Sequence, residues 1–147
     1  MYKRILVPVD GSNPSDVAVR EAIQFVGDRH AELRIIHVIE DVVLAWEAEL
    51  LNVNEIREAL RQSGRQILAK AEAVARAAGI KAETKLIEST PPGARVASLI
   101  AAEAKAWPAD LIVIGTHGRR GVDHLMMGSV AEGVVRNSAE PVLLVRG

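Results

Sequence analysis

The chain has 147 residues, of which 49% are hydrophobic and 25% are charged, a composition typical of one globular domain rather than of a disordered or low-complexity chain. Lys and Arg number 18 against 19 Asp and Glu, and aromatic residues make up 3%, which argues against nucleic-acid binding through basic charge or base stacking. The absence of cysteine excludes a disulfide framework, a thiol nucleophile and a Cys-ligated zinc site.

The first apolar run, residues 5–9, ends at Asp10 and is too short for a signal sequence or a membrane span. No other apolar run approaches the roughly 20 residues that a membrane span requires. We therefore expect a cytoplasmic protein. No linker, second core or internal repeat is evident, so residues 1–147 are expected to form a single domain.

The first third of the chain predicts a strand, a helix and a second strand. Residues 5–9 are almost continuously apolar, as in strands that are buried on both faces, and Pro8 is expected at the strand end because it cannot donate to a ladder. Ser12 or Asn13 can cap a helix that has Pro14 at its first position and ends near residues 27–28. A second buried strand is predicted over residues 33–39.

The remaining elements continue this alternation. Apolar residues recur at helical spacing from residue 54 to residue 78, and Gly79 is expected to end that helix. The further predictions, in chain order, are an insertion that is partly helical at 41–53, an edge strand at 81–88, a helix opened by 91–93 and closed by 107–108, a strand at 110–114, a glycine-rich loop at 115–128, a helix from 129 and a strand at 142–145.

This order of elements predicts an α/β fold. Strands that alternate with helices form a parallel sheet through right-handed crossovers, with helices on both faces. We expect a single doubly wound domain with a five-stranded parallel sheet in the order 3-2-1-4-5. Ligands bind such sheets at the carboxyl ends of the strands where the order reverses, here between the first and fourth strands, which end near Asp10 and Gly115.

The loop that follows the fourth strand has the composition of an anion site. Glycines allow backbone amides to approach a ligand, Arg119 and Arg120 supply bidentate phosphate donors, and Gly128 and Ser129 lead into a helix N-terminus. Each feature alone has a structural alternative: turn glycines, a solvated arginine pair, or a capping box made by Ser129 and Glu132. Their conjunction favours a polyphosphate site, although neither a Walker nor a dinucleotide glycine motif is present.

Asp10 and the histidines leave alternatives open. Asp10 forms an Asx turn, caps the next helix or contacts a ligand, and ligand contact is favoured because Ser12 and Asn13 lie nearer the helix start. His117 and His124 flank the loop as general acid–base groups, phosphate donors or solvated loop residues. His37, inside an apolar strand, is expected to be a hydrogen-bonded core residue.

The same residues carry a family resemblance. Gly115 and Gly118 are followed, after nine intervening residues, by Gly128 and Ser129, and this spacing matches the G-2x-G-9x-G-[ST] signature of the ATP-binding branch of the universal stress protein family. Residues 5–12, 36–39 and 141–145 also resemble the first, second and last strands of that family. The likeness covers essentially the whole chain.

The resemblance implies an ATP-binding regulatory or stress-response protein that acts as a dimeric sensor or switch. Mg²⁺ would be held mainly by the phosphates, and the homodimer would form through Val142, Leu143, Leu144 and Val145. The residues expected to contact ATP, from adenine and ribose to the phosphate tail, are Pro8, Asp10, Val38, Ile114, Gly115, Gly118, Arg119, Gly128, Ser129 and Val130.

Two other functions stay open at this stage. The first is a slow ATPase, or a transferase that uses ATP as phosphoryl or adenylyl donor, in which Asp10, His117 and Arg119 could serve as the catalytic groups. The second is a dimeric interaction module without a working nucleotide site. Gly118→Val is expected to abolish nucleotide binding because its side chain blocks the close approach of the loop.

Overall fold

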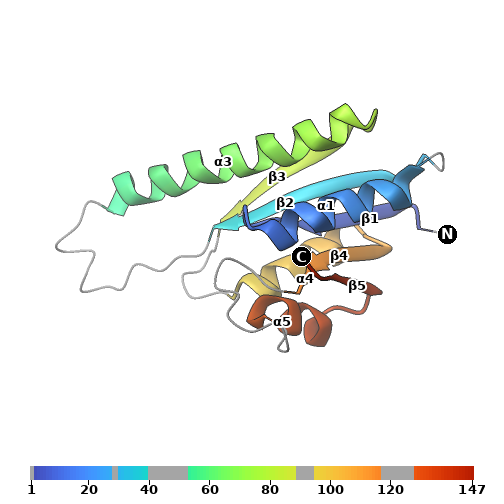
Figure 1. Cartoon of the computed structure of the whole chain (residues 1–147). Helices are drawn as coiled ribbons and strands as arrows, with labels where there is room; N and C mark the ends of the chain where they lie inside the picture. The colour runs from blue at the N-terminus through green and yellow to red at the C-terminus, as the bar shows by residue number, and fades with distance from the viewer. Residues whose placement is uncertain (1, 28–29, 40–52, 89–94, 117–127) are drawn as a thin grey trace.

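The computed structural model describes residues 2–27, 30–39, 53–88, 95–116 and 128–147. Five strands and four helices alternate along these residues (Figure 1). Their bounds are β1 (Arg4–Pro8), α1 (Asn13–Val26), β2 (Glu32–Ile39), α3 (Val53–Ala77), β3 (Ala82–Glu88), α4 (Val96–Ala106), β4 (Leu111–Gly115), α5 (Ser129–Asn137) and β5 (Val142–Val145).

All five strands belong to one parallel sheet with the order β3-β2-β1-β4-β5, which confirms the predicted α/β fold and its strand order. The strand order reverses between β1 and β4, the two central neighbours. Strand β3 lies at one edge of the sheet, as its weak alternation predicts. Strand β5 lies at the other edge, as its position at the end of the chain predicts.

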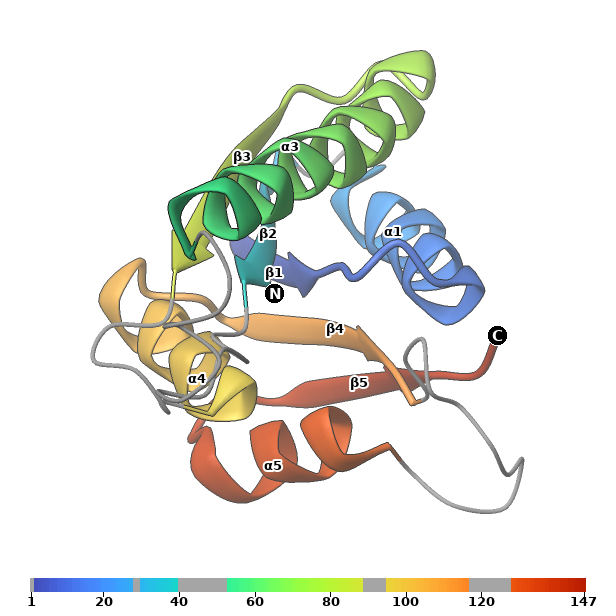
Figure 2. The ribbon, with the colours of Figure 1, turned by 90° about the vertical axis from the view of Figure 1, so that its left-hand side faces the viewer.

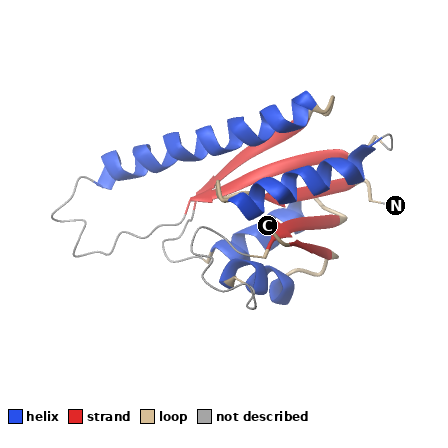
Figure 3. Ribbon diagram, viewed as in Figure 1, coloured by secondary structure: helices blue, strands red, loops and turns tan. Residues whose placement is uncertain are grey.

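Helices cover both faces of the sheet, with α1 and α3 on one side and α4 and α5 on the other (Figures 2 and 3). The side chains of β1 show why the sheet is filled on both sides, because Ile5 and Val7 point into the core under α1 and α3. Leu6 points into the core under α4 and α5, where it packs with Ile100 and Val134. A continuous apolar run in the sequence is therefore a strand that divides its residues between two cores.

The helix ends follow local chemistry. Ser12 is the N-cap of α1 and its side chain accepts a hydrogen bond from the Ser15 amide, while Pro14 is tolerated in the first turn because its missing amide has no intrahelical partner there. Gly79 follows α3 with φ of +80°, a left-handed conformation that glycine adopts without strain.

The predicted boundaries hold to within a few residues wherever the structure describes them. The helix predicted to open at residues 91–93 begins at Val96, and residues 91–93 themselves lie outside the described residues. Most of the predicted insertion, residues 41–52, also lies outside them. Among the helices that are described, none is both long and apolar enough to cross a membrane.

Candidate functional site

The sheet separates at its carboxyl end between β1 and β4. The register of these two strands pairs Ile5 with Leu111 and Leu6 with Ile112, whereas β1 stays paired with β2 as far as Pro8. Strand β4 turns its pairing toward β5 and keeps it to its end. The topological switch point is therefore a physical opening of the ladder, and it lies where the sequence predicts ligand binding.

The turn after β1 is held by its own side chains. The Asp10 carboxylate accepts a hydrogen bond from the Ser12 amide at 2.9 Å, and the Ser15 hydroxyl donates to the Ser12 carbonyl at 2.9 Å. This arrangement is an Asx turn. The expectation that Asp10 takes no part in the local turn, because Ser12 or Asn13 caps the helix, is therefore wrong. Asp10 nonetheless follows the carboxyl end of β1 and is half-buried.

Three predicted contact residues lie on one face of the sheet. Ile114 and Val38 belong to the core under α4 and α5, and alternation along β1 places Pro8 on the same side as Leu6. Ile114 and Pro8 are buried and Val38 is half-buried. These side chains form an apolar floor that crosses β2, β1 and β4 at their carboxyl ends.

Gly115 is required for packing rather than for a left-handed backbone. A Cβ atom at this position would lie 2.8 Å from Pro14 Cβ and 2.9 Å from the Pro14 carbonyl oxygen. The first glycine of the signature thus lets the start of α1 lie directly on the end of β4. Sequence reasoning assigned Gly115 to ligand approach and missed this contact, which no local pattern signals.

The glycine-rich loop leaves and re-enters the fold at neighbouring points. The Gly128 amide donates to the Thr116 carbonyl at 2.5 Å, and the Thr116 amide donates to the Val145 carbonyl at 2.9 Å. Gly128 is the N-cap of α5 and makes no side-chain capping bond, so Ser129 is the first helical residue. The capping-box alternative, in which Ser129 is the cap, is therefore wrong, and the first amides of α5 have no side-chain cap.

Several predicted residues lie outside the described part of the chain. Gly118, Arg119 and Arg120 belong to residues 117–127, as do the two loop histidines, His117 and His124. Within the described ranges, no group of three or more His, Asp or Glu side chains could hold a metal ion. Val130 is described and is 37% exposed at the start of α5.

His37 has a more specific environment than its sequence context predicts. Its Nδ1 atom lies 2.8 Å from the carbonyl oxygen of Val9, the residue before Asp10. The prediction of a hydrogen-bonded residue in the strand is confirmed, but the ring is half-buried and its partner belongs to the end of β1. Only the register of the two parallel strands brings these residues together.

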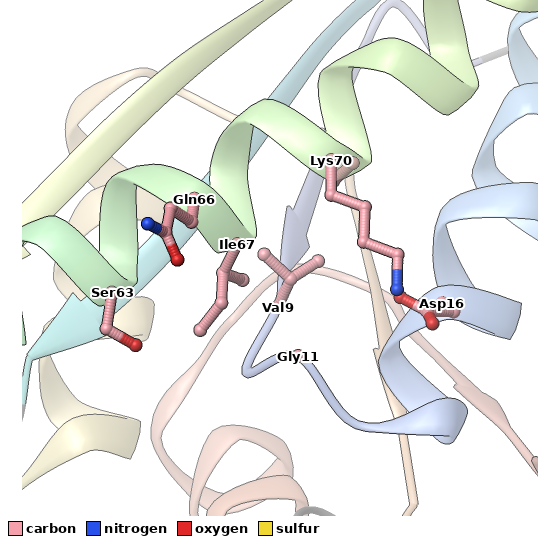
Figure 4. A pocket seen from close by; sticks show the side chains of 8 residues that line it. Val9, Gly11, Asp16, Ser63, Gln66, Ile67 and Lys70 are labelled. Atoms are coloured by element: carbon pink, nitrogen blue, oxygen red, sulfur yellow. The ribbon is translucent and has the colours of Figure 1, made fainter.

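A separate pocket of about 210 Å³ opens on the opposite face of the sheet (Figure 4). Val9 and Gly11 form one wall, and Gln66 and Lys70 of α3 form another, with Lys70 extending toward Asp16 of α1. Val9 belongs to the core under α1 and α3. The pocket therefore contains none of the predicted ATP contacts and is divided by the sheet from Val38 and Ile114.

Comparison with known proteins identifies the family. The sequence model of the universal stress protein family matches residues 1–146. The chain belongs to the universal stress protein family. Universal stress protein MJ0531 of Methanocaldococcus jannaschii is 34% identical over 146 residues, which cover 99% of this chain and 83% of that protein.

Solved structures agree with this assignment. The hypothetical protein MJ0577 superimposes with a TM-score of 0.84 at 26% identity, over 100% of this chain and 97% of that one. A universal stress protein in complex with cAMP superimposes with a TM-score of 0.68 at 27% identity, over 99% and 97% of the two chains. The chain thus has the architecture of the family as well as its sequence pattern, in agreement with the resemblance.

Proposed function

We propose that this universal stress protein binds ATP where β1 and β4 separate, and that the bound nucleotide acts as a regulatory signal in the stress response. The observation that carries the proposal is the start of α5, whose amides lack a side-chain cap directly beside the opened ladder. Amides at a helix N-terminus bind phosphate well because they donate hydrogen bonds and carry about half a positive charge. The relative bound to cAMP supports a nucleotide as the ligand.

The proposed site divides into a nucleoside part and a phosphate part. Adenine rests on the apolar floor of Pro8, Val38 and Ile114, and ribose lies against Asp10 and Gly115. The amides of Gly128, Ser129 and Val130 bind the phosphate tail, and the signature loop with Gly118 and Arg119 completes the phosphate site. Mg²⁺ binds mainly through phosphate oxygens and water, as is usual for this ion at nucleotide sites.

The regulatory output proposed is a change in a homodimer. Strand β5 is an edge strand, and its Leu144 side chain is 37% exposed. An exposed apolar edge favours pairing with a second copy, here through Val142, Leu143, Leu144 and Val145. The loop after β4 connects to this edge through the bond between Thr116 and Val145, so ATP in the loop can bias the dimer.

Calorimetric titration with ATP tests the site directly. We expect Val130→Pro to weaken ATP binding by about 10-fold or more, because it removes one amide donor to a charged phosphate, while Val130→Ala keeps the donor and binds as the wild type does. Proline is acceptable here, since Pro14 occupies the equivalent second position of α1. Absence of binding at millimolar ATP in the wild type would refute the proposed function.

The rate of ATP turnover separates a sensor from an enzyme. Dedicated enzymes turn over at about 1–10³ per second, whereas we expect hydrolysis on the scale of minutes or slower. The physical reason is that the site offers phosphate donors and no general base among its described residues except the Asp10 carboxylate, which is part of the turn. Steady phosphate release at enzyme-like rates would favour the ATPase or transferase alternative.

Sedimentation analysis tests the proposed dimer. Leu144→Lys places a charge on the exposed edge of β5 and is expected to shift the protein to monomer at micromolar concentration. Val135→Lys is the matched control, because Val135 is similarly exposed, at 44%, on α5 rather than on the edge strand. Dissociation by both substitutions, or by neither, contradicts pairing through β5.

A further inference from the structure

We propose that His37 is a positioning residue for nucleotide binding, which holds the carbonyl of Val9 and thereby fixes the turn that carries Asp10. The imidazole Nδ1 lies 2.8 Å from that carbonyl oxygen. A carbonyl oxygen only accepts hydrogen bonds, so Nδ1 carries the proton and donates. Nδ1 is protonated in this way whether the ring is neutral or cationic. This inference rests on the proposed function, since it assigns a role at the same site.

Val9 is the point at which the turn joins the sheet. Its amide donates to the Ile36 carbonyl at 2.8 Å, so both backbone polar groups of Val9 are bound to β2, one through the backbone and the other through the His37 side chain. Beyond Val9, the Asp10 carboxylate and the Ser12 amide close the Asx turn. The turn is thus a locally bonded unit, and Val9 sets its orientation on the sheet.

The separation of β1 from β4 makes this attachment important. Register pairs between these strands end at Leu6 and Ile112, before Val9 is reached. At the level of Val9, the paired neighbour of β1 is β2 alone among the described strands. The opening that admits a ligand therefore removes support from one side of Val9, and the His37 bond adds support from the other.

Gly64 of α3 confines the imidazole ring. A Cβ atom on Gly64 would lie 2.9 Å from His37 Cδ2 and 2.7 Å from Leu86 Cδ1, and Gly64 is buried. A side chain at position 64 would therefore collide with the Cδ2 edge of the ring, and the missing side chain of Gly64 lets α3 pack closely on His37. Because α3 packs on the ring and the ring holds Val9, the position of α3 and the position of the Asp10 turn are coupled.

The test compares substitutions that keep or remove a donor at the position of Nδ1. His37→Asn places an amide N–H there, and His37→Leu fills a similar volume without a donor. In nucleotide-free protein, we expect His37→Leu to speed hydrogen exchange of the amides of residues 10–13 and 15 by about 3- to 10-fold, the factor that corresponds to one neutral hydrogen bond. His37→Asn should stay within about twofold of the wild type.

ATP affinity provides the second readout. Calorimetry should give a dissociation constant about 3- to 10-fold higher for His37→Leu and a near-normal value for His37→Asn. A purely structural role in the core would not be rescued by asparagine, which is more polar and smaller than leucine. If His37→Leu does not fold, His37→Gln makes the same comparison, because its donor lies at the position of Nε2 and is expected to fail like leucine.

The outcomes separate this inference from the proposed function. Unchanged exchange in His37→Leu, or equal effects of the donor-keeping and donor-removing variants, would overturn the positioning role whether or not ATP binds. If the wild type fails to bind ATP while exchange follows the predicted pattern, the proposed function fails and the role of His37 in fixing the turn stands. Normal ATP affinity in His37→Leu despite faster exchange would overturn its role in nucleotide binding.

Discussion

Strands β1 and β4 are held together at the amino end of the sheet and are separated at its carboxyl end. At the amino end, the Asp110 carboxylate accepts hydrogen bonds from the amides of Lys3 and Arg4, at 2.8 and 2.9 Å, so a side chain next to β4 ties down the start of β1. At the carboxyl end, β1 and β4 lose their register after Leu6 and Ile112. Hydrogen bonds at the amino end thus hold together two strands that separate at the carboxyl end, where we propose that the ligand binds.

Charged groups show the same contrast. At the amino end, Glu103 of α4 is 7% exposed and pairs with Arg34 at 2.7 Å and with Lys85 at 2.8 Å. Arg34 also stacks on Trp107, 4.7 Å from the ring centroid. These charges are satisfied within the fold, whereas the start of α5 at the carboxyl end has no side-chain cap. The difference separates groups that stabilise the domain from groups that are available to bind.

Glu103→Ala should produce the largest loss of stability among these variants, because it removes ion pairs at the amino end of the sheet. It leaves Arg34 without its buried partner, and we expect a loss of about 2–3 kcal/mol in the free energy of unfolding, measured with urea. Glu83→Ala is the matched control, because Glu83 pairs with the same arginine but its side chain is 56% exposed, and its loss should cost about 0.5 kcal/mol. Neither change should alter ATP affinity; a large change in that affinity would show that the two ends are not independent.

Gly115→Ala should perturb the carboxyl end by a smaller amount. The added methyl group presses on Pro14, and we expect a loss of about 1–2 kcal/mol in stability together with at least about fivefold weaker ATP binding. Gly79→Ala offers a control of similar cost, since its φ of +80° strains any other residue while lying beyond the end of α3. Equal effects of the two variants on ATP affinity would contradict the assigned site.

Low pH should lower the free energy of unfolding through the carboxylates at the amino end, by less than the substitutions above. Burial alone would raise the pKa of Glu103, but hydrogen bonds from Lys85 and Arg34 outweigh it and lower that pKa, and the backbone amides of Lys3 and then Arg4 lower the pKa of Asp110. Carboxylates with a depressed folded pKa contribute stability that is present above their unfolded pKa and is lost as pH falls through the folded value.

Unfolding free energy should therefore be flat at neutral pH and fall below about pH 4. The measurement is urea denaturation across the acid range. Glu103→Gln, which removes one of the carboxylates whose pKa is lowered by folding, should reduce the slope of that decline relative to the wild type. An unchanged slope would mean that Glu103 does not titrate with folding.

The fold was predictable because its signals are local. Runs such as residues 110–114, and the periodic helix that ends just before Gly79, report burial and capping directly. The signature likewise located α5 and the loop before it. The contacts that shape the site were not predictable in the same way: Gly115 against Pro14 and Gly64 against His37 join residues whose proximity depends on strand order and helix packing. The position of the α5 cap, shifted by one residue to Gly128, shows how small local errors change which amides are available.

The hydrogen bond between Gly128 and Thr116 has a consequence for how this family diversifies. It fastens together the two points between which residues 117–127 run, so the rest of the domain is insulated from the length and composition of that stretch. Lengthening such an excursion costs little chain entropy, about 0.6 kcal/mol for each doubling. Under the proposed function, exchanging residues 117–127 for those of another member should therefore change ligand preference while the described part of the domain keeps its stability.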